Sequence, residues 1–227
     1  MEDEEEEPEV RPSRPSGGGG GGGGGVTYPV KPKEEKKEEE TSEPEKEKYV
    51  PVFSDITEDM WARPYVEGLH AKGIIAGDET GAFRPNDSVS RAEFVKMLTL
   101  AFDLKMQGDE KAFSDVTRED WYYSYVVTAF ASGIVKGKND DYFGATENIT
   151  REDIAVMVQR ALYMTSKDGN LSFADCAEIA DYAKGAIFDL TNANIISGFE
   201  DNTFRPKGFA TRAEAATMIS RAMEQNK

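Results

Sequence analysis

The chain has 227 residues and a formal net charge of -16, with 43 acidic against 27 basic side chains. This balance argues against general nucleic-acid binding, which needs a basic surface, and against electrostatic docking on anionic lipid. The single cysteine, Cys176, excludes a disulfide framework or a cysteine metal cluster within one chain. No apolar run approaches the ~18 residues of a membrane helix.

Residues 1–50 are expected to form a disordered, acidic and glycine-rich linker. They hold 15 acidic and 8 basic side chains and an unbroken glycine run from Gly17 to Gly25. Such a segment cannot bury enough apolar surface to offset the entropy lost on ordering. Its start, Met1-Glu2-Asp3-Glu4, is acidic where a signal peptide is basic and then apolar. We therefore expect either a cytosolic protein or a piece of a longer secreted chain.

The rest of the chain contains one segment three times, about sixty residues apart, which is the signature of a repeat protein. Each copy opens with Phe-Ser/Ala-Asp and closes with a Ser/Thr-Arg-x-Glu/Asp box at residues 90–93, 150–153 and 211–214. The three opening aspartates are Asp55, Asp115 and Asp175. We place the repeats at residues 51–110, 111–170 and 171–227.

A helix is predicted early in each repeat, because apolar side chains recur about four residues apart. In the first repeat the helix is expected to be capped by Asp59 and to stop at Gly73. The helices of the other two repeats are expected to stop at Gly133 and Asn194. The apolar series are Trp61, Tyr65 and Leu69; Trp121, Tyr125 and Phe130; and Tyr182, Ala186 and Leu190.

The box predicts a second helix in each repeat. Its Ser or Thr accepts a hydrogen bond from the third helical amide, and its acid reaches back to the capping amide. Apolar stripes follow all three boxes. Each repeat is therefore helix–loop–helix, and three of them should form one all-α body, since a single repeat cannot bury its own apolar faces.

An arginine follows the capping residue in every box, at Arg91, Arg151 and Arg212. The helix dipole disfavours a cation at this position, by about 0.3–1 kcal/mol at exposed sites. One explanation is that each arginine pairs with an acidic neighbour, for which the opening aspartates of an adjacent repeat are candidates. The other is that arginine and free helix amides together bind an anionic group from outside. Both can hold at once.

Trp61 and Trp121 come eight residues after the opening phenylalanines. As bare sequence features they are expected to be core anchors. An indole edge exposed to a groove would instead stack on sugar rings. An anionic sugar is therefore a sensible ligand class.

These linked motifs resemble the S-layer homology domain. The family pattern is an opening Phe-x-Asp, a Trp-Ala-x-x-Tyr helix, a Gly-Ile-Ile-x-Gly loop, a Gly-x-Phe-Arg-Pro turn and Thr-Arg-Ala-Glu. In the first repeat these motifs, with Ser for Thr in the last, stand at residues 53–55, 61–65, 73–77, 81–85 and 90–93. The resemblance covers about residues 52–225.

The resemblance implies a pseudo-threefold, all-helical body with the three first helices bundled at its centre. It also implies that grooves between repeats bind anionic, pyruvylated secondary cell-wall polysaccharide, and that the domain anchors an upstream passenger or S-layer protein to the bacterial surface. No catalytic residue, metal or cofactor is expected. The expected carbohydrate-binding residues are the three box arginines, the three opening aspartates and, where their indoles face a groove, Trp61 and Trp121.

The sequence departs from the family pattern in the second and third repeats. Gly144-Ala145 replaces Arg-Pro, Asp153 replaces Glu, Tyr182 replaces Trp and Asn194 replaces Gly. We therefore expect unequal affinities among the grooves, with the least typical site formed by third-repeat elements.

Three alternatives remain. Acidic loops at residues 78–81 and 139–141 suggest calcium, although their spacing does not fit an EF-hand. An enzyme would need a catalytic pair that spacing alone does not identify, and the only histidine, His70, lacks a nucleophile partner. The main rival is a helical protein–protein interaction module of the cell envelope that binds no glycan.

Overall fold

The structure, a computed structural model, describes residues 49–106, 113–165 and 169–225. All described residues belong to one compact unit, Glu47–Lys227. Residues 1–48 of the predicted linker lie outside the described residues. Tyr49, at the end of that predicted linker, contacts the first helix through the Glu67 carboxylate and the Arg63 guanidinium.

The described part is all-helical, as the sequence predicts, and contains isolated β-bridges but no named strand. The α-helices are α1 (Arg63–Ala71), α2 (Arg91–Ala101), α3 (Tyr123–Ala131), α4 (Arg151–Ala161), α5 (Asp181–Asn192) and α6 (Arg212–Gln225), and a 3-10 turn, η1, spans Cys176–Glu178. Each repeat thus contributes a first helix (α1, α3 or α5) and a box helix (α2, α4 or α6).

The predicted ends of the first helices are confirmed, but the predicted start of α1 is wrong. Gly73, Gly133 and Asn194 follow these helices with φ of 70°, 72° and 56°, the left-handed conformation that ends a helix. However, α1 begins at Arg63 after Ala62, and no side chain caps it. Asp59 instead accepts a hydrogen bond from the Thr57 hydroxyl at 2.6 Å. Trp61 therefore precedes the helix rather than lying on its apolar stripe.

The box helices α2 and α6 are capped as predicted, and α4 is capped only in part. Ser90 and Glu93 exchange both bonds of a capping box at the start of α2. Thr211 and Glu214 do the same at α6, with distances of 3.2 and 2.8 Å. At α4, the Thr150 hydroxyl accepts from the Asp153 amide, while the shorter Asp153 carboxylate points elsewhere.

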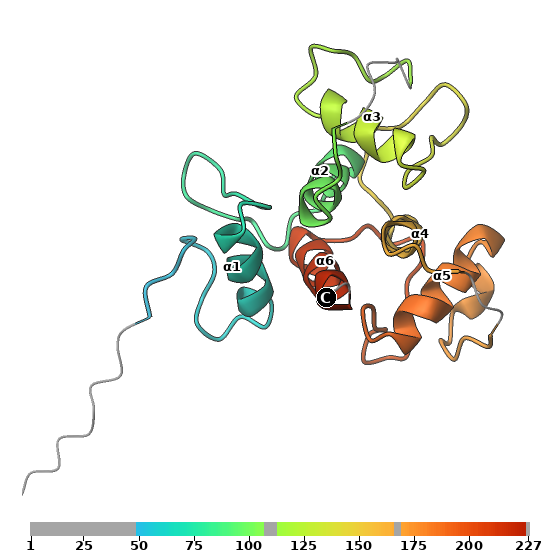
Figure 1. The fold of residues 1–227 in the computed structure, drawn as a ribbon. Helices are drawn as coiled ribbons and strands as arrows, with labels where there is room; N and C mark the ends of the chain where they lie inside the picture. The colour runs from blue at the N-terminus through green and yellow to red at the C-terminus, as the bar shows by residue number, and fades with distance from the viewer. Residues whose placement is uncertain (1–48, 107–112, 166–168, 226–227) are drawn as a thin grey trace, which may run out of the picture. The chain divides into compact units, whose positions relative to one another are not determined.

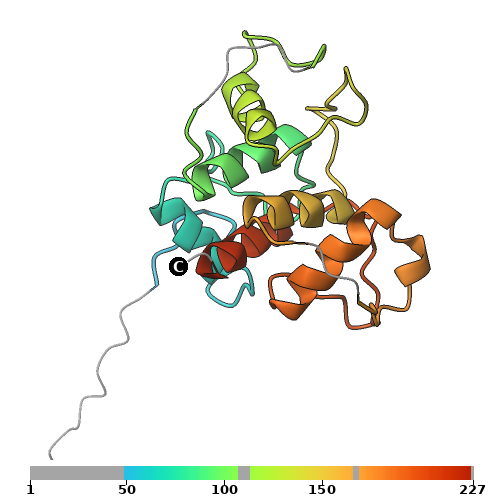
Figure 2. The ribbon, with the colours of Figure 1, turned by 45° about the vertical axis from the view of Figure 1, so that its right-hand side comes forward.

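The expectation that the first helices form the central bundle is wrong. The box helices α2, α4 and α6 contact one another. Each first helix packs on the box helix of the preceding repeat, with the last repeat counted as preceding the first: α3 on α2, α5 on α4, and α1 on α6. Figures 1 and 2 show the box helices together in the middle, with one first helix outside each of them, so that each pair forms a lobe. Each lobe therefore combines elements of two repeats, and the pair α1–α6 joins the first repeat to the last.

A ring of backbone hydrogen bonds lies between the repeats just before the boxes. The Val89 amide donates to the Ala210 carbonyl, the Ala210 amide to Ile149, and the Ile149 amide to Val89, over 3.0–3.1 Å. All three residues are fully buried. The ring gives the repeats a cyclic order; exact pseudo-threefold symmetry remains a prediction.

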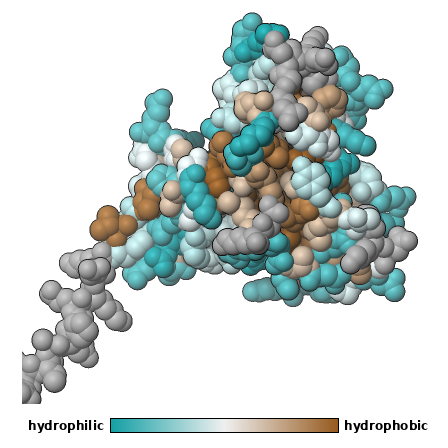
Figure 3. Space-filling view, in the orientation of Figure 1, coloured by the Kyte–Doolittle hydropathy of each residue, from teal (hydrophilic) through white to brown (hydrophobic). Residues whose placement is uncertain are grey.

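The apolar core runs through all three repeats. Figure 3 shows apolar residues over the middle of the face seen in Figure 1, with hydrophilic residues around them. Each opening phenylalanine packs on the phenylalanine of the turn in its own repeat at about 5.5 Å between ring centroids, in the pairs Phe53–Phe83, Phe113–Phe143 and Phe173–Phe204. These pairs hold each turn against the start of its repeat.

The opening aspartates also stabilise these turns, by accepting hydrogen bonds from their backbone amides. The Asp55 carboxylate accepts hydrogen bonds from the Phe83 and Arg84 amides at 2.8 and 2.7 Å. Asp175 binds the corresponding amides of the third repeat, and Asp115 binds three consecutive amides of the second. The bonds fix a left-handed residue, which is Arg84 with φ 59° in the first repeat and Gly144 with φ 77° in the second. Glycine adopts this conformation without steric cost, which accounts for the departure at Gly144.

In the acidic loop of the first repeat, the Asp78 carboxylate is bound by neighbouring residues of the same repeat. Asp78 accepts hydrogen bonds from the Thr80 hydroxyl and amide and from the Ala82 amide, and it pairs with Arg84 at 2.6 Å. These contacts, led by the Thr80 hydroxyl, lower the pKa of Asp78 to about 2 from an ordinary value of 3.8. Among the described residues, no group of three or more His, Cys, Asp or Glu side chains is placed to hold a metal ion.

This lowered pKa predicts an acid-sensitive contribution to stability. Because the folded-state pKa lies below the ordinary value, the contribution is present above about pH 4 and is lost as pH falls through about 2. Asp78→Asn should therefore lower the thermal midpoint at neutral pH and have little effect near pH 2. Melting curves of the parent and the variant across this range check the prediction; an equal difference at both ends would contradict it.

Candidate functional site

Each box arginine reaches out of its own repeat into the turn of the next one. From the first turn of α2, the Arg91 Nε donates to the Phe143 carbonyl at 3.0 Å, and Nη1 pairs with Asp153 at 2.6 Å. Nη2 donates to the Lys136 carbonyl at 3.4 Å, and the guanidinium lies 4.9 Å from the Phe143 ring centroid. The Arg91 side chain is only 3% exposed.

The same contacts recur at the other two boxes in cyclic order. Arg151 donates to the Phe204 and Ser197 carbonyls and pairs with Glu214 at 2.8 Å. Arg212 donates to the Phe83 carbonyl and pairs with Glu93 at 2.9 Å, which closes the cycle on the first repeat. Burial is the main cause that lowers the pKa of Arg151.

The partner acid of each arginine is therefore the acid of the next box. The predicted pairing of the arginines with the opening aspartates is wrong, because those aspartates bind backbone amides of their own repeat. The box acids have two partners: Glu93 accepts the Ser90 amide with one oxygen and Arg212 with the other. An arginine placed against its own helix dipole is thus offset by a carboxylate at the start of another helix.

Three aligned hollows lie between the repeats, and each contains one box arginine and its partner acid. Groove 1 contains Arg212 and Glu93, groove 2 contains Arg91 and Asp153, and groove 3 contains Arg151 and Glu214. Their volumes are about 470, 930 and 260 Å³. A further hollow of about 440 Å³ shares Ile196, Ser197 and Arg221 with groove 3. Each groove is thus assembled from more than one repeat.

An aromatic ring at or just before the start of the next first helix stands at the rim of each groove. These rim aromatics are Trp121 in groove 1, Tyr182 in groove 2 and Trp61 in groove 3, and they are 56%, 60% and 60% exposed. The expectation that Trp61 and Trp121 are core anchors is therefore wrong. Their aligned position places them before or at the start of the first helix, where a ring extends past the box helix into the groove.

The box helices add a second cation to every groove, which the sequence analysis missed. Arg160 and Arg221 occupy the same aligned position in grooves 2 and 3, nine residues after the box arginine. Leu100 takes this position in α2, and Lys96, one turn earlier, lines groove 1 instead. The sequence contains a basic residue on each box helix that could have indicated these cations. In the first repeat this residue stands one turn earlier, so aligning the three repeats does not reveal it.

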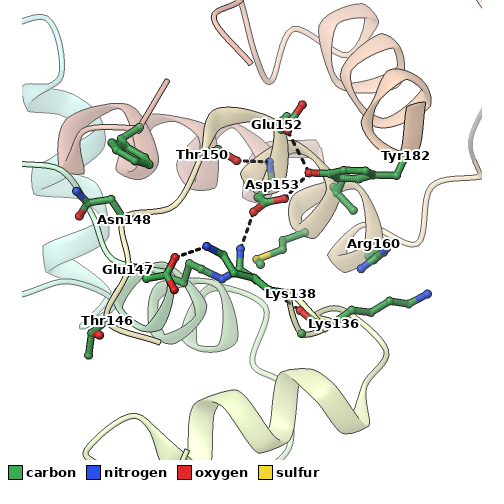
Figure 4. A pocket seen from close by; sticks show the side chains of 15 residues that line it. Lys136, Lys138, Thr146, Glu147, Asn148, Thr150, Glu152, Asp153, Arg160 and Tyr182 are labelled. Carbon is green, nitrogen blue, oxygen red and sulfur yellow. Dashed lines mark hydrogen bonds and ion pairs between the residues drawn. The ribbon is translucent and has the colours of Figure 1, made fainter. Parts of the chain in front are cut away.

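Groove 2 differs from the others in its hydrogen bonding (Figure 4). The Tyr182 hydroxyl lies 2.8 Å from Asp153 and 3.1 Å from Glu152, a carboxylate that is only 3% exposed. Glu152 also accepts the Ala180 amide and pairs with Lys207. Burial and these two carboxylates raise the pKa of Tyr182. Positions 92 and 213, which correspond to Glu152, are alanines, so among the three grooves this cluster occurs in groove 2 alone.

The opening aspartates do not line any of the three grooves in the structure. They bind the backbone amides of the turns instead. Of the predicted site residues, the structure therefore brings together the box arginines and the two tryptophans, each arginine deep in a groove and each tryptophan at a rim. Whether these residues contact a carbohydrate remains a prediction.

The fold and grooves define a module of helix–loop–helix repeats closed into a ring, with one aromatic-rimmed groove per repeat. The family model of the S-layer homology domain matches residues 52–95, 112–155 and 172–216. The chain belongs to the S-layer homology domain family.

Relatives include both enzymes and surface-layer proteins. The chain is 35% identical over 179 residues to exoglucanase XynX of Acetivibrio thermocellus, covering 77% of this chain and 16% of the relative. It is 29% identical over 167 residues to the surface-layer 125 kDa protein of Lysinibacillus sphaericus, covering 72% and 14%. It is 27% identical over 177 residues to the S-layer protein sap of Bacillus anthracis, covering 76% and 21%.

The chain thus spans about a fifth or less of the length of these relatives. The family and the surface-layer relatives identify it as a cell-surface anchoring module, located at the cell wall. No helix in the described ranges is long and apolar enough to cross a membrane.

The buried arginine network predicts a large stability effect. Arg151→Ala should lower the free energy of unfolding by about 3 kcal/mol, because it leaves the Glu214 carboxylate, which is 19% exposed, without its cation. Chemical denaturation followed by helical circular dichroism measures this difference.

Lys184→Ala is the control, because Lys184 pairs with Asp181 at the surface, where the two side chains are 52% and 96% exposed. Its loss should cost less than about 1 kcal/mol. Equal effects of the two substitutions would show that the arginine network contributes nothing beyond an ordinary surface ion pair.

Proposed function

We propose that the grooves bind an anionic secondary cell-wall polysaccharide, with a pyruvylated amino sugar as the recognised unit, and so tether an upstream passenger or S-layer protein to the bacterial surface. The observation that carries this proposal is the combination of an exposed aromatic ring with at least two cations in each aligned groove. Aromatic faces stack on the apolar faces of sugar rings, and cations bind their acidic substituents.

The net charge of the chain makes local cations necessary. A chain with a formal charge of -16 repels an anionic polymer at long range. Binding therefore needs positive groups concentrated within the groove. Two of the box arginines are nearly saturated by their own contacts, since the Arg91 and Arg151 side chains are 3% and 5% exposed, whereas the Arg212 side chain is 18% exposed. We assign them a positioning role and a positive potential behind the groove.

Direct contact with the acidic substituent falls to the second cations, Lys96, Arg160 and Arg221, which are partly exposed in the grooves. The opening aspartates act indirectly in this proposal, because they hold the turns that form the groove walls. The module itself is proposed to be non-catalytic. XynX, an exoglucanase by name, matches this chain over only 16% of its own length, which fits an accessory segment.

The competing function is a helical protein–protein interaction module without glycan binding. The three grooves favour the polysaccharide, because each combines exposed aromatic rings with cations and carboxylates rather than a continuous apolar face. Binding to a repeating polymer through several grooves on one chain would also gain affinity by avidity.

Sedimentation of the labelled chain with purified wall polysaccharide tests the proposal. The polymer is used intact and after mild acid removal of its pyruvyl groups; binding should be strong to the first and weak to the second. The double variant Trp61→Ala, Trp121→Ala should weaken binding about 5- to 150-fold, because each lost aromatic platform is worth about 0.5–1.5 kcal/mol.

Tyr163→Ala is the control, since Tyr163 is an aromatic residue that is 76% exposed and lies outside the grooves. It should bind as the parent does. Equal binding to intact and acid-treated polymer would exclude the anionic substituent as the recognised group, and absence of binding to either would favour the protein–protein alternative.

A further inference from the structure

We propose that the buried hydrogen bond between Gln159 of α4 and Asp189 of α5 fixes the register of these two helices and so holds the Tyr182 ring at the rim of groove 2. The Gln159 Nε2 donates to the Asp189 Oδ2 at 2.7 Å, and the two residues are 8% and 5% exposed. Neither residue lines groove 2 itself. They act as positioning residues, whether or not the groove binds a carbohydrate.

Tyr182 depends on the helix register because it belongs to a helix, unlike the two rim tryptophans. Trp61 and Trp121 each lie two residues before the first residue of their helix, so the turns before α1 and α3 place their rings. Tyr182 is the second residue of α5, which begins at Asp181. A slide of α5 by one helical turn would therefore move the Tyr182 ring by about 5.4 Å relative to α4.

Apolar packing alone determines this register weakly. Buried apolar residues recur three or four apart on both helices, so a one-turn slide again places apolar side chains against apolar ones. The Gln159–Asp189 pair does not recur in this way. One turn along α4 from Gln159 stands Ala155, which is fully buried and offers no side-chain donor. Burying the Asp189 carboxylate without its donor should disfavour the slid register by about 5- to 150-fold.

A second polar contact fits the same alignment of the two helices. At their starts, the Tyr182 hydroxyl donates to Asp153 and to Glu152 at 2.8 and 3.1 Å (Figure 4). Glu152 and Tyr182 stand seven residues before Gln159 and Asp189, so the two contacts lie about two turns apart on both helices. Tyr182 is 60% exposed, and its hydrogen bonds compete with water. The buried Gln159–Asp189 pair therefore makes the larger contribution to the register.

The other two lobes have different residues at the corresponding positions. These are Thr99 and Thr128 in the lobe of α2 and α3, and Ser220 and Gly68 in the lobe of α6 and α1. Neither set contains a side-chain amide or a carboxylate. The Thr99 hydroxyl is buried, and within the described part of the chain it has no hydrogen-bond partner. The amide–carboxylate pair thus occurs in the lobe whose rim aromatic lies within a helix.

Alkaline titration of the Tyr182 phenol tests the proposal without any ligand. Burial and the Asp153 and Glu152 carboxylates raise the pKa of Tyr182 above its ordinary value of 10.0. The other charged groups near this hydroxyl are Lys207, which pairs with Glu152, and Arg160, which lines groove 2. The difference in phenolate absorbance between each protein and its Tyr182→Phe derivative isolates this one tyrosine. The titration stays below the pH at which helical circular dichroism is lost.

The double variant Gln159→Met, Asp189→Leu replaces the pair by apolar side chains of similar shape. It should unfold with an equilibrium constant within about tenfold of the parent's, because both partners are removed together. The pKa of its Tyr182 should return toward the ordinary value of 10.0. A second double variant, Gln159→Thr, Asp189→Thr, carries the residues of the α2–α3 lobe. It should give the same result and replaces the first variant if that one does not fold.

Asp189→Asn should keep the raised pKa of Tyr182, because its amide oxygen can still accept from Gln159. Thr99→Val is the control, since it removes a buried hydroxyl from the corresponding position of another lobe, and it should titrate as the parent does. A raised pKa of Tyr182 in both double variants would show that apolar packing sets the register, and would overturn the proposal. A parent whose Tyr182 ionises at its ordinary pKa would also overturn it, because the ring would then not be held between the two carboxylates.

Discussion

The ion pair between each box arginine and the acid of the next box is the interaction on which the rest of the structure depends. One guanidinium joins two repeats, fixes the carbonyls of a turn and supports the start of a neighbouring helix. It also lies at the base of a groove. Stability and the shape of the grooves therefore rest on the same side chains, so loss of binding in an arginine variant would not by itself show direct contact with a ligand.

In the proposed function, the grooves allow an acidic chain to bind an acidic polymer despite the repulsion between their charges. At physiological ionic strength the repulsion of distant surface charges is screened over about 8 Å, while a cation within a groove acts at contact distance. The three second cations occupy such positions, and of the arginines behind them Arg91 and Arg151 are buried while Arg212 is partly exposed. The chain can thus keep a surface that resists non-specific association and still recognise an anion locally.

The sequence predicted the helices and the repeat order well, because capping boxes and left-handed helix ends are local features. It predicted Gly73, Gly133 and Asn194 as helix ends for this reason. It did not predict the packing of α1 on α6 or the exposure of Trp61, since both depend on which repeat lies beside which. The partner of each arginine was missed for the same reason. The opening aspartates and the box acids both carry carboxylates, and only the packing of the repeats into a ring decides which carboxylate lies beside each arginine.

The ring of backbone bonds at Val89, Ile149 and Ala210 determines how such a module can grow in evolution. In an open solenoid, the terminal repeat has one face that no other repeat covers. A new repeat can pack on that face, so the array can lengthen one repeat at a time. Here every donor in the ring already has its acceptor. A fourth copy arising by gene duplication would find no place in the circle, so wall-binding capacity can expand only by adding whole sets of three.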